Sequence, residues 1–155
     1  MKKWMAGIAL VSLAMGMAAQ AQDDGPFAMQ IKARQGLMNY RAINVGTLAA
    51  MAKGEAEYDA ATAKTAADAL LASATFDMSM LWPAGSDNAA NPKSTASAAI
   101  WAEGSKIGED SATFLAATQA MAAGAGTDLA SLQAAMGALG GSCGSCHKAF
   151  RVPTN

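Results

Sequence analysis

The sequence predicts an all-α protein, an antiparallel four-helix bundle, on three observations. Alanine is abundant throughout the 155 residues, and the polar–apolar alternation that indicates strands is absent. Turn-forming residues fall at wide intervals and divide the chain into four helical segments. In three of these segments bulky apolar residues recur at steps of three, four or seven, the spacing of helix faces packed in a bundle.

The first helix is predicted to run from about residue 27 to residue 51. Asp23-Asp24-Gly25-Pro26 before it is typical of a helix start, with acidic caps and a proline in the first turn. Lys53-Gly54-Glu55 is predicted to end it. Its interior residues recur every seven positions: Ile31, Met38 and Val45. Met38 is therefore expected to face the interior of the bundle.

The second and third helices are predicted over residues 60–75 and 97–123. Asp59 is the expected cap of the second helix and Ser97 begins the third. The third has an interior stripe every seven residues, formed by Ile100, Ile107, Phe114 and Met121. The connection from residue 76 to residue 97 is unusually long for a small domain, and such connections often carry function.

The last helix is predicted to begin at Thr127 or Asp128 and to reach the C-terminal end of the chain. Its residues at alternating steps of three and four are Leu129, Leu132, Met136, Leu139, Cys143, Cys146 and Phe150. The two cysteines thus share the seam of the apolar core. Gly140 and Gly141 weaken this helix, which indicates either a bulky group close to the backbone or a simple kink.

Cys143-Gly-Ser-Cys146-His147 contains both cysteines and the single histidine of the chain. Cys-x-x-Cys-His is the attachment signature of c-type haem, in which each thiol binds one vinyl group and the imidazole binds the iron. On a helix these three side chains share one face and can reach one flat cofactor. Trp82, in the long connection, is expected either to cover the cofactor or to cap the end of the bundle.

Three other interpretations of the motif are weaker. A zinc site needs four ligands, and the chain has three Cys or His residues within five positions. A thioredoxin-like thiol pair lies at a helix N-terminus, whereas this pair lies near the end of a predicted helix. A disulfide would close a very small loop and would leave His147 without a purpose.

The N-terminal segment predicts export. Residues 1–21 combine Lys2 and Lys3, a short apolar run and the Ala19-Gln20-Ala21 cleavage pattern of a cleaved signal peptide. The mature domain, 22–155, would be a single domain of about 134 residues with a net charge of about −3, no membrane span and no basic patch for nucleic acid. The predicted location is the periplasm.

The chain resembles the class II cytochromes c, the cytochrome c′ family. The resemblance rests on residues 143–151 (Cys-Gly-Ser-Cys-His-Lys-Ala-Phe-Arg), Arg34-Gln35-Gly36-Leu37-Met38, Lys53-Gly54-Glu55 with Tyr58-Asp59, and Ile100-Trp101. It implies a four-helix bundle with one covalently bound haem c. By this resemblance Cys143 and Cys146 hold the haem, His147 is the proximal iron ligand, and Arg34, Gln35 and Arg151 lie near the haem. Phe150 departs from the family, which often has Tyr there.

Met38 decides between two functions. Only eight residues follow His147 and none is Met, so a second axial ligand must come from upstream, where Met38 is best placed. In one branch of the family this residue ligates the iron, and the protein carries single electrons between redox partners. In the other it packs on a five-coordinate haem that binds NO or CO. The sequence shows no nucleophile, base or substrate pocket of an enzyme, and the resemblance also suggests a homodimer through the first two helices.

Overall fold

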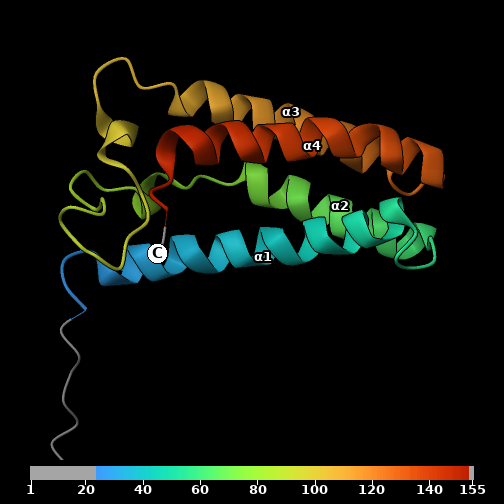
Figure 1. Cartoon of the computed structure of the whole chain (residues 1–155), viewed down its shortest axis with the longest axis horizontal. Coiled ribbons are helices and arrows are strands. Elements are labelled where there is room, and N and C mark those ends of the chain that lie inside the picture. The colour runs from blue at the N-terminus through green and yellow to red at the C-terminus, as the bar shows by residue number, and fades with distance from the viewer. Residues whose placement is uncertain (1–23, 154–155) are drawn as a thin grey trace, which may run out of the picture.

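The computed structural model describes residues 24–153 as an antiparallel bundle of four α-helices (Figure 1). The helices are α1 (Ala28–Lys53), α2 (Ala60–Thr75), α3 (Ile107–Gly124) and α4 (Leu129–Phe150). Within this range no strand forms, and one isolated antiparallel bridge pairs Ala96 with Arg151. The predicted fold class is confirmed. The predicted signal peptide, residues 1–21, lies outside the described residues.

Three helix boundaries lie where local chemistry predicts them. Gly54 ends α1 in the left-handed conformation, with φ of 75°, and its N–H donates to the Met51 carbonyl. Asp59 caps α2 by accepting a hydrogen bond of 2.7 Å from the Thr62 N–H. Asp128 caps α4 in the same way. These polar and glycine caps satisfy backbone groups that a helix end leaves unpaired.

The start of α1 differs from its prediction. Phe27 occupies the N-cap position in a left-handed conformation, without a side-chain cap, and no acidic residue lies in the first turn. Asp24 instead forms ion pairs with Lys32 and Lys93. The reason is that Asn91 donates to the Asp24 and Pro26 carbonyls at 2.8 and 2.9 Å, which fastens this segment to the long connection.

The third predicted helix is wrong over its first ten residues. A short 3₁₀ helix, η2 (Ala98–Trp101), is followed by extended backbone at Ala102 and by Gly104 with φ of 73°. A left-handed glycine ends helical geometry, so α3 begins only at Ile107. Ile100, expected on the bundle stripe, packs in a separate cluster with Ala96 and Phe150.

The apolar core extends along the bundle as far as Leu139, one helical turn before Cys143. Small alanine side chains let the helices approach one another closely there. The buried members of this cluster are Leu48, Met51, Ala63, Ala66, Ala67, Leu70, Ala117, Met121, Ala125, Leu132 and Leu139. Of the residues predicted on the α4 seam, Leu129 is exposed whereas Leu132, Leu139 and Phe150 are buried.

The long connection between α2 and α3 covers residues 76–106, because α3 begins later than predicted. It gathers at the end of the bundle where α1 begins and α4 ends (Figure 1). It contains a second 3₁₀ helix, η1 (Ser79–Leu81), besides η2. Its last part is joined to the end of α4, because Val152 donates to the Thr95 carbonyl at 2.8 Å and Ser97 to that of Phe150 at 2.9 Å. The connection and the attachment motif therefore form one unit.

Among residues 24–153, no helix combines the length and apolar character needed to cross a membrane.

Candidate haem site

The Cys-x-x-Cys-His segment is entirely helical and lies in the last two turns of α4. Cys143 and Cys146 are half-buried free thiols, and His147 is exposed. Ser145, between the cysteines, donates to the Asp110 carboxylate at 2.9 Å and ties this turn to α3. The helix thus presents the two thiols and the imidazole on one side, as the attachment chemistry requires.

Cys146 packs in an aromatic cluster that the long connection supplies. Trp82, Trp101, Ile107 and Cys146 surround the buried Ala96, Ile100 and Phe150. The two indole rings lie 6.3 Å apart, and the Trp101 N–H donates to the Trp82 carbonyl at 3.1 Å. Trp82 therefore packs in the same cluster as an attachment thiol, which favours the cofactor-covering alternative over a cap remote from the motif.

The cysteines do not have the character of a thioredoxin-like pair. Burial, with the nearby Asp110 carboxylate and Cys143, raises the pKa of the Cys146 thiol, whereas a reactive pair needs a lowered thiol pKa. No group of three or more His, Cys, Asp or Glu side chains that could hold a metal ion occurs in the described part of the chain. The zinc interpretation thus gains no fourth ligand from residues 24–153.

His147 is exposed beside open space at the C-terminal end of α4. With Lys148, Arg151 and Pro153 it lines a depression of about 410 Å³. Partial burial, followed by the positive charge of Arg151, lowers the pKa of His147 and favours the neutral imidazole, which is the form that binds metals. Arg151 lies one helical turn beyond His147, and its N–H donates to the His147 carbonyl at 3.0 Å.

Arg34 is buried, with 5% of its surface exposed, and it holds the long connection. Its guanidinium donates to the Leu81 and Ser86 carbonyls and to the Ser86 and Ser94 hydroxyls, at 2.6 to 3.3 Å. The same group lies over the Trp82 ring, 4.6 Å from its centroid. Gln35 adds a hydrogen bond of 2.8 Å to the Lys93 carbonyl. Both side chains thus bind the connection that carries Trp82.

Met38 is half-buried in the first half of α1. It belongs to a seam with alternating steps of three and four: Ile31, Arg34, Met38, Arg41, Val45 and Leu48. Ile31, Arg34 and Leu48 of this seam are buried, and the interior position of Met38 stays a prediction.

The sequence matches the profile of the family described as Cytochrome C′ over residues 29–151. The chain belongs to the cytochrome c′ family. It is 41% identical over 144 residues to cytochrome c-554 of Cereibacter sphaeroides, covering 93% of this chain and 94% of that protein.

Solved cytochrome c′ structures share the fold. That of Rhodobacter spheriodes superposes with a TM-score of 0.80 at 38% identity, covering 83% of this chain and 98% of the other. A carbon monoxide-bound variant from Alcaligenes xylosoxidans superposes with a TM-score of 0.70 at 27% identity, covering 80% and 94% of the two chains.

The donor set of this cytochrome c′ family member fits haem c, because two thiols and an imidazole lie within five residues of one helix. Between Ile31 and Leu48, α1 buries no apolar side chain completely, and between Leu139 and Phe150 the only buried residue of α4 is Ser142. Gly140, Gly141 and Gly144 are exposed, and α4 continues as one helix through them. Haem c, one per chain, is the cofactor of this family, and Cys143, Cys146 and His147 are the residues that would hold it.

Sequence reasoning missed Arg41, the second arginine of the α1 seam. Its Nε donates to the Ser73 hydroxyl at 3.0 Å, its Nη2 to the Ser73 carbonyl at 2.5 Å, and its guanidinium lies 4.6 Å from the centroid of the Phe114 ring. The signal was present in the sequence, because Arg34 and Arg41 are three residues after Ile31 and Met38, at interior positions of the heptad pattern.

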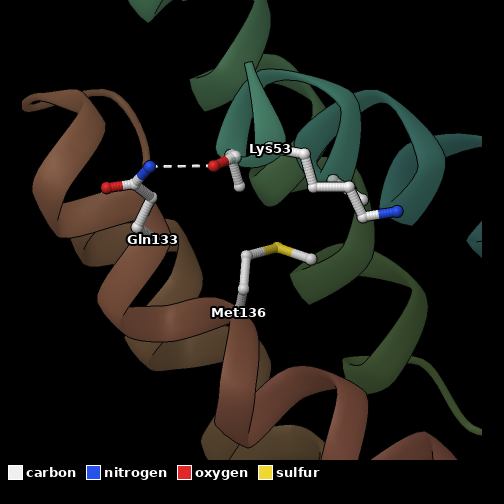
Figure 2. A pocket seen from close by; sticks show the side chains of 5 residues that line it. Lys53, Gln133 and Met136 are labelled. Carbon is white, nitrogen blue, oxygen red and sulfur yellow. Dashed lines mark hydrogen bonds between the residues drawn. The ribbon is translucent and has the colours of Figure 1, made fainter. Parts of the chain in front are cut away.

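A second depression, about 300 Å³, lies between the last turns of α1 and the first turns of α4, away from the motif (Figure 2). Ala49, Ala52, Lys53, Gln133 and Met136 line it. Gln133 donates to the Ala52 carbonyl at 2.8 Å, and the Lys53 side chain extends away from Gln133 (Figure 2). Its lining contains no thiol, imidazole or carboxylate, so it offers no second site for a metal or nucleophile.

Proposed function

We propose that this protein is an exported cytochrome that carries single electrons between redox partner proteins. Cys143 and Cys146 hold the haem covalently, and His147 is the proximal iron ligand. When bound, the haem supplies a ferric–ferrous couple. The observation that carries the proposal is the half-buried thiol pair of α4 with His147 directly after it, on one helix whose Cys146 packs in an aromatic cluster.

Met38 is proposed as the sixth ligand, the property that favours electron transfer. Its spacing with Ile31 and Val45 predicts a thioether on the face of α1 turned toward the bundle, and its half-buried state supports this. Thioether ligation raises a haem reduction potential and leaves no free coordination position.

The chain's other residues position and enclose the cofactor. Arg34 and Gln35 hold the long connection, and this connection places Trp82 beside Cys146. We propose that Arg34, Gln35 and Arg151 lie near the haem at its edges, as the family resemblance implies.

The proposal of export rests on residues 1–21. A charged start, an apolar run and a small-residue cleavage pattern predict a cleaved signal peptide and a periplasmic protein. The single mature domain would begin at residue 22. Mass spectrometry of the exported protein gives both the cleavage position and the mass of one attached haem.

The second candidate function is gas binding. A related cytochrome c′ variant has been solved with carbon monoxide bound, so the fold admits this ligand. In that case Met38 would pack against the haem without bonding to the iron, leaving an open position for NO or CO.

An optical spectrum of the purified protein with and without CO tests these alternatives. A low-spin spectrum that CO barely alters, and that becomes high-spin and CO-sensitive on Met38→Ala, supports the electron carrier. A high-spin spectrum with ready CO binding in the unmodified protein supports the gas-binding alternative. A colourless product, expressed with the haem-attachment machinery, would contradict both.

A further inference from the structure

Arg41 places a positive charge between the helices at the level of the attachment cysteines. Its contacts come from two other helices: Ser73 belongs to α2 and Phe114 to α3. The Met78 sulfur, just after α2, accepts a longer hydrogen bond of 3.7 Å from the Arg41 Nη2. Phe114 lies one helical turn after Asp110, and the Asp110 carboxylate accepts from Ser145, which stands between Cys143 and Cys146 on the fourth helix. The two thiols accordingly influence the pKa of Arg41.

Every group bound to this guanidinium is neutral. Ser73 contributes a hydroxyl and a carbonyl, Phe114 a ring face and Met78 a thioether. None of the five ion pairs found among residues 24–153 includes Arg41. Burial lowers the pKa of Arg41 and the two thiols oppose this effect. An arginine nevertheless remains protonated in proteins, so the charge is permanent.

The surroundings of the Arg41 guanidinium screen its charge less than water would. Ser73 is buried, with 2% of its surface exposed, and Phe114 packs against the apolar core. In such a medium a charge interacts more strongly with its neighbours than in water, and salt screens it less. Because Ser73 binds the guanidinium through two groups, the charge is also held in place.

We propose that Arg41 is a fixed internal cation that raises the reduction potential of the haem attached to Cys143 and Cys146. Reduction adds one electron, taken from the redox partner, which is oxidised by one electron, and no bond to Arg41 forms or breaks. The ferric centre carries one more positive charge than the ferrous centre. A permanent neighbouring cation therefore destabilises the ferric state more than the ferrous state.

This inference depends on the proposed haem attachment but not on whether the protein carries electrons. If a haem propionate paired with Arg41, removal of the arginine would leave that carboxylate uncompensated, so the potential would fall in that case too. The measurement therefore tests the effect of the Arg41 charge whether or not a propionate lies beside it.

The test is the reduction potential of the haem-loaded protein by optical titration, for wild type and three variants. Arg41→Met removes the charge and keeps an unbranched side chain. Arg41→Lys keeps the charge. Lys53→Met is the matched control, because it removes a cation from the exposed end of the same helix.

We expect Arg41→Met to favour the ferric state about tenfold, which corresponds to about 59 mV for a one-electron couple. Arg41→Lys is expected to keep most of the wild-type potential, and Lys53→Met all of it. The difference in reduction potential between wild type and Arg41→Met should change little between about 0.01 M and 0.5 M salt, since the charge is internal. An Arg41→Met potential equal to that of wild type, or higher, overturns the inference.

Ser73→Ala decides the matter if Arg41→Met does not load haem. This substitution removes the hydroxyl that accepts from the Arg41 Nε and leaves the charge on the protein. Because the guanidinium is then held less firmly, we expect the reduction potential to fall by less than in Arg41→Met. An unchanged potential in Ser73→Ala would then overturn the inference. The proposed electron transfer fails separately, by a high-spin, CO-binding spectrum of the wild-type protein.

Discussion

Arg34 shows how one side chain can organise a segment far along the sequence. It satisfies four acceptors of the connection, on Leu81, Ser86 and Ser94, while lying against the Trp82 ring. The connection has few buried apolar residues of its own, so these polar contacts define its conformation. A single residue of α1 therefore determines where the aromatic cover of Cys146 lies.

Replacing Arg34 with Met is expected to destabilise the protein by about 2–4 kcal/mol, because several buried acceptors lose a charged donor at once. Urea denaturation of the haem-loaded protein measures this loss. Gln35→Ala is the matched control, since it removes one exposed hydrogen bond from the same helix turn, and its cost should stay below about 1 kcal/mol. Equal effects of the two substitutions would contradict the proposed role of Arg34.

The ion pairs of Asp24 make the stability of the folded protein depend on pH in the acid range. Hydrogen bonds from Lys32 and Lys93 lower its pKa from 3.8 to about 2. A carboxylate with a lowered pKa stabilises the folded state fully above its unfolded pKa, and this stabilisation disappears as the pH falls from 3.8 toward 2. The thermal unfolding midpoints of wild type and Asp24→Asn should therefore differ above this window and converge below it. A difference that persists unchanged at the lowest pH would refute the assignment.

Sequence reasoning predicted single residues well where their chemistry is local. The motif cysteines, Asp59 and Asp128 act through neighbours within four positions, and their helical setting follows from the sequence. Arg34 and Gln35 were expected near the haem, and their hydrogen bonds to the connection were not anticipated. Those bonds join residues 47 to 60 positions apart, and no pattern in the sequence specifies such a pairing.

At the scale of elements, the turn between α3 and α4 depends on a close approach to α2. A Cβ added at Gly126 would lie 2.8 Å from the Lys64 Cβ and 3.3 Å from the Ala60 carbonyl oxygen. Gly137, in the middle of α4, has no atom within 4 Å of an added Cβ. The same substitution should therefore have opposite effects at these two glycines.

Gly126→Ala is expected to cost about 1–3 kcal/mol, because the helices must separate to relieve the overlap. Gly137→Ala is expected to stabilise the protein by about 0.5–1 kcal/mol, since alanine is the better residue in an open helical position. Chemical denaturation of both variants checks the signs. Equal signs would show that the turn adapts, or that α4 is constrained at Gly137.

The limits of α1, α2 and α4 follow from the sequence, whereas the start of α3 does not. Gly54 and the aspartate caps act within their own segments, so those ends were predictable. The stripe from Ile100 to Met121 continues without interruption, and it concealed the break at Gly104. Ile100 keeps its apolar role but packs beside Phe150 in the aromatic cluster, a contact that depends on the path of the whole connection.

On the scale of the whole molecule, α1 carries a second seam on its outer face. Met29, Tyr40 and Ile43 are apolar and exposed, by 80%, 47% and 69%. With Ala33, Gly36 and Thr47 they repeat at alternating steps of four and three. Gly36 has no atom within 4 Å of an added Cβ. This is the spacing of a helix that packs on a partner helix, and it supports a part for α1 in the predicted homodimer through the first two helices.

Ile43→Lys is expected to weaken the dimer at least tenfold, or about 1.4 kcal/mol, by placing a charge in this apolar seam. Sedimentation equilibrium over a range of protein concentrations measures the dissociation constant. Ala120→Lys on the exposed face of α3 is the control, and it should leave the dissociation constant unchanged. Wild-type protein that remains monomeric at high concentration would refute the dimer.

The long connection fastens both ends of the described range, near Asp24 and Val152, at one pole of the bundle. Asn91 and Lys93 bind Asp24, and Thr95 binds Val152. A purification tag attached after Val152 would consequently start at the pole that carries the attachment motif, where it could obstruct a docking protein. The turn at residues 55–57, at the opposite pole, is exposed and is the better place to insert a label.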